Sequence, residues 1–277
     1  MTDIKGRTAF ITGGANGIGL GIARSFARAG AKLALVDLDT DALARAKAEL
    51  QDITQVETFK LDVSDRNAYM AIAEEAERAV GPVSLLFNNA GVAGGESLKK
   101  LTYELWDWYI NINLYGVING LMAFLPKMLE RDLGGYIVNT SSGAGLAATN
   151  SGVLYTTTKY AVVGMTEDLY TDRSLKKAGI GVSVLCPGMV ATNIMERTAN
   201  VTPKGEAGKL TEEQEKRIHE FAVKTDEKLH EFGASIDAVG EMVLKAVQEN
   251  QLFILTDHYV EDFVKARTEE ILKSMPN

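Results

Sequence analysis

Cysteine, proline and long apolar runs are scarce in this chain. Its 277 residues include one cysteine, Cys186, and five prolines. A single cysteine excludes an intrachain disulfide and a cysteine-based metal cluster, so we predict no metal site and expect Cys186 to be a buried structural thiol. No run reaches the roughly 20 apolar residues that a membrane-spanning helix needs. The first residues also lack the hydrophobic stretch of a signal peptide, so we expect a cytoplasmic protein with no membrane partner.

Basic charge is scarce as well. The chain has 29 Lys and Arg against 37 Asp and Glu, a formal net charge of -8, and its basic residues are scattered. Nucleic-acid binding normally relies on clustered positive charge, so we expect no nucleic-acid partner. A hydrophobic content of 46% and a charged content of 24% are ordinary for a globular protein. The length suits one large domain, and we predict a single domain over residues 1–277.

The N-terminal part has a strand, a glycine-rich turn and a helix in succession. Residues 7–12 form a near-continuous apolar run, typical of a parallel strand that is buried on both faces. Glycines then permit a tight turn and let backbone N–H groups approach a pyrophosphate at the positive end of the following helix. A glycine pattern alone is weak evidence, but this context predicts a dinucleotide site. Its candidate contacts are Gly13, Asn16, Gly17, Ile18 and Gly19.

Asp37 follows the second apolar run, about twenty residues after the glycine turn. A carboxylate at this point would accept hydrogen bonds from the adenosine ribose hydroxyls and would repel a 2′-phosphate. No Arg or Lys lies in the turn or directly after Asp37. These features predict NAD rather than NADP as the cofactor, although Asp37 could also be a solvated loop acid.

Apolar runs and helical patterns continue to alternate along the chain. This alternation predicts an α/β fold, a Rossmann-type doubly wound parallel sheet of about seven strands with helices on both faces. Ligands of such sheets bind at the carboxyl ends of the strands. The expected strands cover residues 7–12, 32–36, 56–61, 83–87, 135–140, 180–185 and 252–255, and the expected helices cover 20–29, 41–50, 66–80, 103–129, 153–177, 236–249 and 259–273.

Polar residues mark two further points of this pattern. Asp62 and Val63 follow the third strand, where an acid and a backbone group could hold the amino group of an adenine. Asn113 and Asn119 lie within the expected helix 103–129, although asparagine is a poor helix former unless its side chain makes specific contacts. Both asparagines are therefore expected to have partners elsewhere in the fold.

Tyr155 and Lys159 carry the most specific chemistry. A spacing of four residues in a helix puts both side chains on one face. Ser142 lies upstream, where a strand-like run ends in small residues. A phenol beside an ammonium, with a hydroxyl nearby, can move a proton to or from an alcohol oxygen. Tyr-x-x-x-Lys also occurs by chance on solvated helix faces, so its meaning depends on the dinucleotide site.

Taken together, these motifs resemble the short-chain dehydrogenase/reductase family over residues 5–192, with a weaker C-terminal part. Each motif is weak alone, and their order along the chain makes the resemblance specific. Of two adjacent serines, the spacing usual in the family selects Ser142, with Ser141 as the alternative. The motifs are Thr12-Gly-x-x-x-Gly-Ile-Gly19, Asp62, Asn88-Asn-Ala-Gly91, Asn113, Ser142, Tyr155-x-x-x-Lys159 and Pro187-Gly188.

The resemblance implies a role for each of these residues. Tyr155 would be the general acid/base, with a phenolic pKa lowered by Lys159 and by the nicotinium charge. Ser142 would hold the substrate oxygen, Asn113 would anchor a water that passes the proton outward, and Lys159 would also hold the nicotinamide ribose. Thr192 would hold the nicotinamide carboxamide. Further implied cofactor contacts are Asn89, Ala90, Gly91, Tyr155, Pro187, Gly188 and Val190.

Residues 195–233 form a charged insertion that departs from a minimal family member. Thr211-Glu-Glu-Gln214 reads as a helix-capping box, and Gly233 as a helix end. We expect a mobile helical lid whose apolar stripe faces the substrate pocket, with a surface or oligomer helix as the equal alternative. The stripe comprises Ile218, Phe221, Ala222, Leu229 and Phe232.

The residues expected around the substrate are small or apolar, and no arginine stands ready for a carboxylate or phosphate. We therefore predict an uncharged, fairly hydrophobic secondary alcohol or ketone, possibly aromatic. Alternatives are an NADP-dependent ketone or 3-oxoacyl reductase and, from another class, a non-catalytic NAD-binding regulator. The family suggests a homo-oligomer, either a dimer or a homotetramer. The expected substrate contacts are Ser142, Ala144, Leu146, Tyr155, Met189 and Met195, within a wider wall of Val92, Ala93, Gly143 and Val190.

Overall fold

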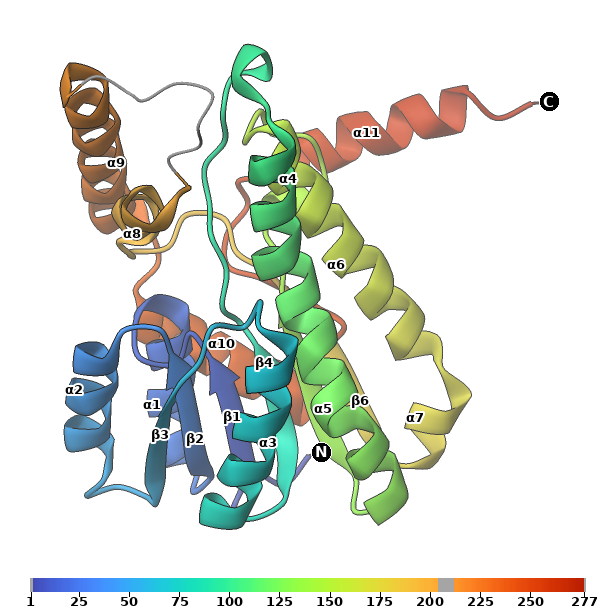
Figure 1. Ribbon diagram of the computed structural model, residues 1–277. Coiled ribbons are helices and arrows are strands. Elements are labelled where there is room, and N and C mark those ends of the chain that lie inside the picture. The colour runs from blue at the N-terminus through green and yellow to red at the C-terminus, as the bar shows by residue number, and fades with distance from the viewer. Residues whose placement is uncertain (1, 204–211, 277) are drawn as a thin grey trace.

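Seven parallel strands form one sheet in the computed structural model, which describes residues 2–203 and 212–276 (Figure 1). The strand order is β3-β2-β1-β4-β5-β6-β7. The chain thus begins in the middle of the sheet, runs to one edge and then crosses to build the other half. The predicted doubly wound parallel sheet is confirmed. The strands are β1 (Thr8–Thr12), β2 (Lys32–Asp37), β3 (Val56–Lys60), β4 (Val83–Asn88), β5 (Gly135–Thr140), β6 (Ile180–Cys186) and β7 (Phe253–Leu255).

The strand order reverses between β1 and β4, which pair directly with each other. A crevice forms at such a switch point because the connections from the two strands leave toward opposite faces of the sheet. The residues that follow β1, β4, β5 and β6 all meet at this edge. Every motif of the sequence analysis that belongs to a strand end therefore converges there.

Two hydrophobic clusters show how the helices cover the two faces of the sheet. Alternate strand residues face opposite sides, so Ile11 packs with one cluster and Phe10 with the other. The first face is covered by α1 (Gly17–Arg28), α2 (Thr40–Leu50) and α10 (Ile236–Glu249), and the second by α3 (Arg66–Val80), α5 (Gly116–Arg131) and α6 (Val153–Thr171).

Helices α1 and α10 approach closely because glycines meet at their crossing. A Cβ on Gly21 would collide with the carbonyl of Ile236, and one on Gly240 would collide with the carbonyl of Gly21. The start of α10 is fixed by Ser235, whose hydroxyl accepts a hydrogen bond from the backbone N–H of Ala238 at 3.1 Å. The C-terminal part of the chain is thereby fastened to the helix that follows the glycine turn.

The expected helix over residues 103–129 contains a wider turn. It consists of α4 (Tyr103–Ile110), a π-helical turn (Asn111–Tyr115) and α5. Such turns insert one residue into an α-helix and occur often at functional sites. By length and composition the whole run, Tyr103–Arg131, would also pass as a membrane span, which was not expected. Half of its most apolar window is buried inside the protein.

The expected helix over residues 153–177 is divided at Asp172, which has an extended backbone with ψ of 130°. Its carboxylate accepts hydrogen bonds from the N–H groups of Ser174 and Leu175 and so caps α7 (Arg173–Lys177). The prediction of one continuous helix was wrong, because this aspartate satisfies the donors of a new helix instead of continuing the old one.

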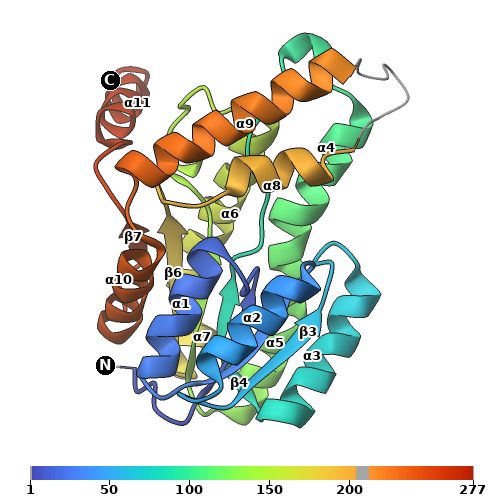
Figure 2. The ribbon, with the colours of Figure 1, turned by 90° about the vertical axis from the view of Figure 1, so that its left-hand side faces the viewer.

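Three helices, α8 (Ile194–Val201), α9 (Glu212–Phe232) and α11 (Glu261–Lys273), lie outside the two helical layers (Figure 1). Figures 1 and 2 show α8 and α9 beyond the upper ends of the strands, above α1 and α2. Helix α11 projects from the body of the molecule and buries none of its residues (Figure 1). The proposed capping residue Thr211 lies outside the described residues, whereas Gly233 follows the last residue of α9 as predicted.

Candidate active site

The glycine turn between β1 and α1 needs its glycines for two reasons. Gly13 and Gly17 adopt positive φ angles of 61° and 50°, a backbone conformation that other residues rarely adopt. Gly19 needs space, since a Cβ there would collide with the carbonyl of Gly13. Helix α1 begins at Gly17, three residues before the predicted start. The N–H groups of the turn and of the first helical residues, Ile18 among them, therefore lie at the open end of the sheet.

Asn16 supplies an independent sign that this turn holds an acceptor-rich ligand. Its side-chain Nδ2 is buried and has no hydrogen-bond partner. Asn16 also occupies the N-cap position of α1, yet its side chain makes no capping bond. Buried polar groups normally have partners, and a phosphate or ribose oxygen would provide one here. The turn therefore fits a dinucleotide, which the sequence pattern predicts.

Asp37 ends β2 directly beside this turn. Its carboxylate accepts a hydrogen bond from Ala15 N at 3.3 Å and one from Asp39 N at 3.2 Å. The aspartate is thus held against the glycine turn and remains half-buried. This is the placement that a ribose-binding carboxylate requires, and it makes a freely solvated loop acid an unsuitable description.

An arginine from far along the chain reaches the same region. Arg197 on α8 pairs with Asp39, with 2.8 Å between Nη2 and Oδ2. The pKa of the Asp39 carboxyl is lowered by its backbone bond from Ala42 and by the charges of Arg197 and Arg45. Arg197 is 158 positions from Asp39 along the chain, so only the fold brings it to this region.

Residues after β3 and β4 are held by side-chain hydrogen bonds. Asp62 is exposed and accepts from Ser64 N at 2.9 Å, while the carbonyl of Val63 accepts from Asn119 Nδ2 at 2.8 Å. The N–H groups of Asn89 and Ala90 both donate to Thr12 Oγ1, at 2.8 and 3.0 Å.

The Asn89 amide also donates to the carbonyl of Thr12 at 3.0 Å. The side chains of Asn89 and Asn119 therefore hold backbone carbonyls of neighbouring loops in place. A direct contact of the Asn89 side chain with a cofactor stays a prediction.

Asn113 lies in the π-helical turn and clamps the loop after β4. Its Oδ1 accepts from Val92 N at 2.9 Å, and its Nδ2 donates to Val92 O at 3.1 Å and to Thr158 Oγ1 at 3.3 Å. The expectation that Asn113 has a specific partner is therefore confirmed. Both amide hydrogens are used, so a bound water would have to use the remaining lone pair of Oδ1 or a backbone carbonyl.

The two adjacent serines have different partners. Ser141 is buried, and its hydroxyl donates to the backbone carbonyl of Lys159 at 2.8 Å. The Ser142 hydroxyl accepts from Ala144 N at 3.2 Å and lies near enough to the Tyr155 phenol to lower its pKa. The geometry thus gives Ser141 a structural contact and places Ser142 with the tyrosine, as the family spacing implied.

Lys159 is buried, with 4% of its surface exposed. Its ammonium donates to Thr140 O at 3.2 Å and lies 5.6 Å from the ring centre of Tyr155. A Cβ on Gly91 would stand 3.4 Å from this nitrogen and 3.0 Å from Asn113 Oδ1, so all three residues border one small volume. Burial lowers the pKa of Lys159 to about 8.

Loss of hydration in the partly buried site raises the pKa of Tyr155, and the neighbouring Ser142 hydroxyl lowers it by a smaller amount. The net direction is opposite to the lowering that we expected from Lys159 together with the nicotinium charge. In the chain alone, the loss of hydration outweighs the neighbouring hydroxyl. A phenol that works near neutral pH therefore needs additional positive charge in the complete site.

Cys186 is buried at the end of β6, as expected for a structural thiol. Burial raises its pKa to about 12, so the thiol stays protonated and unreactive at neutral pH. No group of three or more metal-ligating side chains occurs among residues 2–203 and 212–276. The chemistry of this region thus rests on hydroxyl, amide and amine groups.

The predicted substrate contacts divide into two sets. Met189 and Met195 are partly exposed, and Met195 lies close to Gly94 in the loop after β4. Leu146 instead packs on a buried cluster that contains Val163. Leu146 is itself partly exposed, and its contact with a substrate stays a prediction. The remaining predicted wall residues, Val92, Ala93, Gly143, Ala144 and Val190, are buried, and Val190 forms a β-bridge with Ala234.

Helices α8 and α9 are fastened to each other by a buried acid. Asp226 on α9 is 4% exposed and accepts from the N–H groups of Met195 and Glu196, at 3.1 and 2.8 Å. It thereby caps α8, whose own N-cap residue Asn193 makes no side-chain capping bond. A polar residue that the sequence analysis passed over thus decides how the insertion is packed.

The predicted apolar stripe of this insertion does not form one buried face. Ala222 is buried and Leu229 partly so, whereas Ile218, Phe221 and Phe232 are exposed. Asp226 orients α9 so that its Ala222 side lies toward the protein. The orientation of the stripe toward a substrate stays a prediction.

Helix α8 and the loop before it contact both the loop after β4 and the glycine turn. On the substrate side, the buried hydroxyl of Thr198 accepts a hydrogen bond from Ala93 N at 3.0 Å. On the cofactor side, Thr192 packs against Gly17, where a Cβ would lie 3.2 Å from its methyl group. Together with the Arg197 ion pair, these contacts place α8 across the open edge of the sheet.

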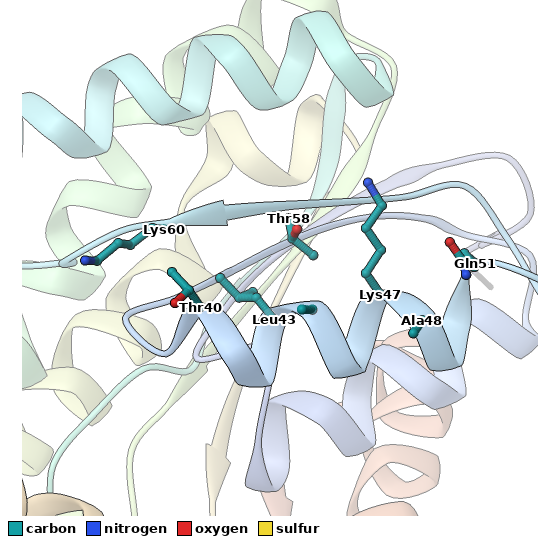
Figure 3. Close-up of a pocket in the computed structure, with 8 residues that line it drawn as sticks. Thr40, Leu43, Lys47, Ala48, Gln51, Thr58 and Lys60 are labelled. Carbon is teal, nitrogen blue, oxygen red and sulfur yellow. The ribbon is translucent and has the colours of Figure 1, made fainter.

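A shallow recess lies apart from this centre, between α2 and the edge strand β3 (Figure 3). It is lined by Thr40, Leu43, Ala44, Lys47, Ala48, Gln51, Thr58 and Lys60. The ion pair between Lys47 and Glu57, at 2.8 Å, ties the helix to the strand beside it. None of the predicted catalytic residues contributes to this recess.

The fold and the site define a Rossmann-type α/β protein with a serine, a tyrosine and a lysine gathered at the switch point of the sheet. A sequence model of the short chain dehydrogenase family matches residues 7–202. The chain therefore belongs to the short-chain dehydrogenase family and is an oxidoreductase.

Similar proteins fall in the same family. A C alpha-dehydrogenase of Sphingobium sp. (strain NBRC 103272 / SYK-6) is 34% identical, over 99% of this chain and 88% of its own. A 3beta-hydroxysteroid dehydrogenase 2 of Eggerthella lenta is 36% identical over 69% of this chain and 74% of its own. The crystal structure of a short chain dehydrogenase/reductase from Burkholderia phymatum in complex with NAD superposes with a TM-score of 0.88 at 34% identity, covering 100% of this chain and 98% of the other.

Proposed function

We propose that this protein is an NAD-dependent oxidoreductase that interconverts a secondary alcohol and its ketone, with Tyr155 as general acid/base. The observation that carries the proposal is the placement of Tyr155 beside Ser142, with its ring centre 5.6 Å from the buried Lys159 ammonium. The unpartnered amide of Asn16 in the adjacent glycine turn, and the NAD complex of the Burkholderia phymatum relative, support the cofactor.

Each residue of the site has a defined part in this reaction. Bound NAD would supply the hydride acceptor, and its reduced form the donor. Ser142 holds the substrate oxygen at the Tyr155 hydroxyl, and Tyr155 takes the proton of the alcohol or returns it to the ketone. Lys159 favours the phenolate through its charge and holds the nicotinamide ribose. Asn113 fixes the loop at Val92 and anchors the water that carries the proton onward.

The substrate that best fits this site is uncharged and hydrophobic, with aromatic alcohols among the candidates. The two methionines that border the cleft, Met189 and Met195, are flexible apolar side chains that adapt to bulky molecules. The name of the Eggerthella lenta relative denotes a dehydrogenase of a 3β-hydroxysteroid, which is a large uncharged secondary alcohol. Both observations favour a bulky alcohol over a small polar one.

A panel of alcohols and ketones with both nicotinamide cofactors tests the proposal. We expect reduced NAD to accumulate with uncharged secondary alcohols, followed by its absorbance, and no comparable rate with carboxylate-bearing alcohols. NAD binding without turnover of any member of the panel would instead support a non-catalytic NAD-binding regulator. A cytoplasmic location and a homo-oligomer, either a dimer or a tetramer, are the accompanying proposals that the family suggests.

Asp37→Ala is expected to weaken NAD binding by about 10- to 100-fold, because hydrogen bonds to a charged group contribute about 1.5–3 kcal/mol. Asp41→Ala, which changes an exposed acid in the first turn of α2, is the matched control and should leave the affinity unchanged. Calorimetric titration of each variant with NAD and NADP measures the effect. Equal NAD affinity of the wild type and Asp37→Ala would remove Asp37 from the ribose site.

One observation favours the alternative of an NADP-dependent ketone or 3-oxoacyl reductase. Arg197 pairs with Asp39 close to the expected position of the adenosine ribose. A guanidinium there could receive a 2′-phosphate if it left Asp39. We favour NAD, because Asp37 is fixed against the glycine turn and would repel that phosphate. A wild-type preference for NADP in the same titrations would reverse this choice.

We also propose that residues 195–233 act as a lid over the substrate, with α8 as its covering element. Thr198→Val should raise the Michaelis constant for the alcohol by about 5- to 20-fold, because it removes the bond to Ala93 N and leaves a buried donor unpaired. Asn200→Ala, at an exposed position of the same helix, should change nothing. An unchanged Michaelis constant in Thr198→Val would contradict the lid and would make α8 and α9 a surface element.

A further inference from the structure

The segment after β7 supports two loops that the proposed reaction uses. β5, β6 and β7 are adjacent parallel strands, so their carboxyl ends share one edge of the sheet. Residues 141–145 follow β5, residues 187–192 follow β6, and residues 256–260 follow β7. The first loop carries Ser142, and the second carries the predicted contacts of the nicotinamide. The third loop has no role in the function proposed so far.

Thr256 and Asp257 bind the backbone of the second loop directly. Thr256 Oγ1 accepts from Gly188 N at 2.9 Å, and Asp257 Oδ2 accepts from Met189 N at 2.8 Å. Thr256 is 9% exposed, so its bond is shielded from water. Two consecutive N–H groups of the nicotinamide-side loop are thus fixed by side chains rather than by regular secondary structure.

Gly188 is adapted to this arrangement. A Cβ at this position would lie against the carboxylate of Asp257, so any other residue would push the acid away from the loop. The opposite oxygen of the same carboxylate accepts from Tyr259 N at 2.9 Å, which orients the acid. Glycine and aspartate therefore form one fitted pair, and the aspartate is held in place from its own side as well.

The same segment also touches the serine loop. Val260 is buried against Gly143, where a Cβ would collide with its methyl group. Gly143 in turn donates its N–H to the carbonyl of Pro187 at 2.8 Å. The loop that bears Ser142 and the loop that begins with Pro187 are thus joined to each other, and residues 256–260 lie against both.

From these contacts we infer that Thr256 and Asp257 are positioning residues that fix the Pro187–Met189 backbone, and through Gly143 the Ser142 loop, in the geometry for hydride transfer. The inference rests on the proposed function, since it assigns this loop to the nicotinamide side. Misplacement of reacting groups by about 1 Å can lower a rate by about 100-fold. Loosening this loop should therefore affect the chemical step more than binding.

The test compares Asp257→Ala and Thr256→Val with the wild type. Asp262→Asn, an exposed acid in the first turn of α11, is the control. Hydrogen exchange of the peptide that spans residues 184–191 should quicken in both variants and not in the control. We expect kcat to fall by about 10- to 100-fold with a smaller change in the Michaelis constants, and the primary deuterium isotope effect to increase. Asp257→Asn retains an acceptor for Met189 N and should recover part of kcat.

Each outcome decides the inference. Unchanged exchange, or faster exchange with kcat and the isotope effect unchanged, overturns the positioning role. A lower kcat with an unchanged isotope effect also overturns it, because a smaller folded fraction alone produces that result. Should Asp257→Ala fold poorly, Thr256→Val and Asp257→Asn give the same comparison. A wild type that binds NAD and turns over no alcohol counts against the proposed function instead.

Discussion

Replacing Tyr155 with phenylalanine is expected to lower kcat by about 10²- to 10⁴-fold, with a much smaller change in NAD affinity. The substitution removes one oxygen and keeps the ring that packs against α4. Without the hydroxyl, the alcohol proton has no acceptor beside Ser142, so the chemical step loses its base. The measurement is the rate of NAD reduction at saturating alcohol, together with calorimetric titration by NAD.

The control for this experiment is Tyr160→Phe, which removes a hydroxyl from the same helix at a ring that lies beneath Arg267. We expect it to keep wild-type activity. If Tyr155→Phe retained about a tenth or more of the wild-type kcat, the phenol would not be the proton acceptor, since acid–base catalysis contributes at least about 100-fold.

Replacing Lys159 with methionine is expected to lower kcat strongly and to stabilise the cofactor-free protein at pH 7. The ammonium is buried and donates to a single carbonyl, Thr140 O. Its pKa falls from 10.5 to about 8, which corresponds to a stability cost of up to ~3 kcal/mol for the charged form. Methionine has a similar length and carries no charge, so the variant avoids this cost.

The sign of the pH dependence follows from the lowered pKa. Between about pH 8 and 10.5 the folded chain binds fewer protons at Lys159 than the unfolded chain does, so this residue makes the free energy of unfolding rise with pH. The difference in the free energy of unfolding between Lys159→Met and the wild type should therefore be largest below pH 8 and should shrink toward pH 10. Denaturant unfolding at several pH values measures it.

Lys177→Met, at an exposed position of α7, is the matched control and should leave both stability and activity unchanged. A Lys159→Met variant that is less stable than the wild type at pH 7 would mean that the ammonium stabilises the fold. An active Lys159→Met variant would remove the lysine from the proposed proton transfer.

Local patterns were sufficient to predict the sheet and the catalytic spacing. Buried parallel strands appear as apolar runs, and the glycine turn appears where strand and helix periods meet. Tyr155 and Lys159 are one helical turn apart, so their shared face is a local property. These features depend on neighbours within a few residues and were therefore accessible from the sequence.

Features that depend on distant parts of the chain were not accessible in this way. Arg197 pairs with Asp39 across 158 positions, and Asp226 caps a helix that begins 32 positions before it. Asp257 supports a loop 68 positions upstream. No local period marks such contacts. The only available signal was an acidic residue with no evident partner, which describes most surface acids equally well.

The burial of Tyr155 shows a similar limit. Its pKa direction is set by how much water the fold excludes, and by Ser142, rather than by the spacing to Lys159. The pKa of the phenol therefore lies above its ordinary value in the chain alone, and the positive charge of a bound nicotinamide would have to lower it.

Direct titration of the Tyr155 phenol, as the difference in phenolate absorbance between the wild type and Tyr155→Phe, tests this claim most closely. We predict that Tyr155 ionises above the usual tyrosine pKa without NAD, and below it with saturating NAD, at the same pH that governs kcat/KM for the alcohol. Ionisation that does not move when NAD binds, in an enzyme that is active at neutral pH, would contradict the account.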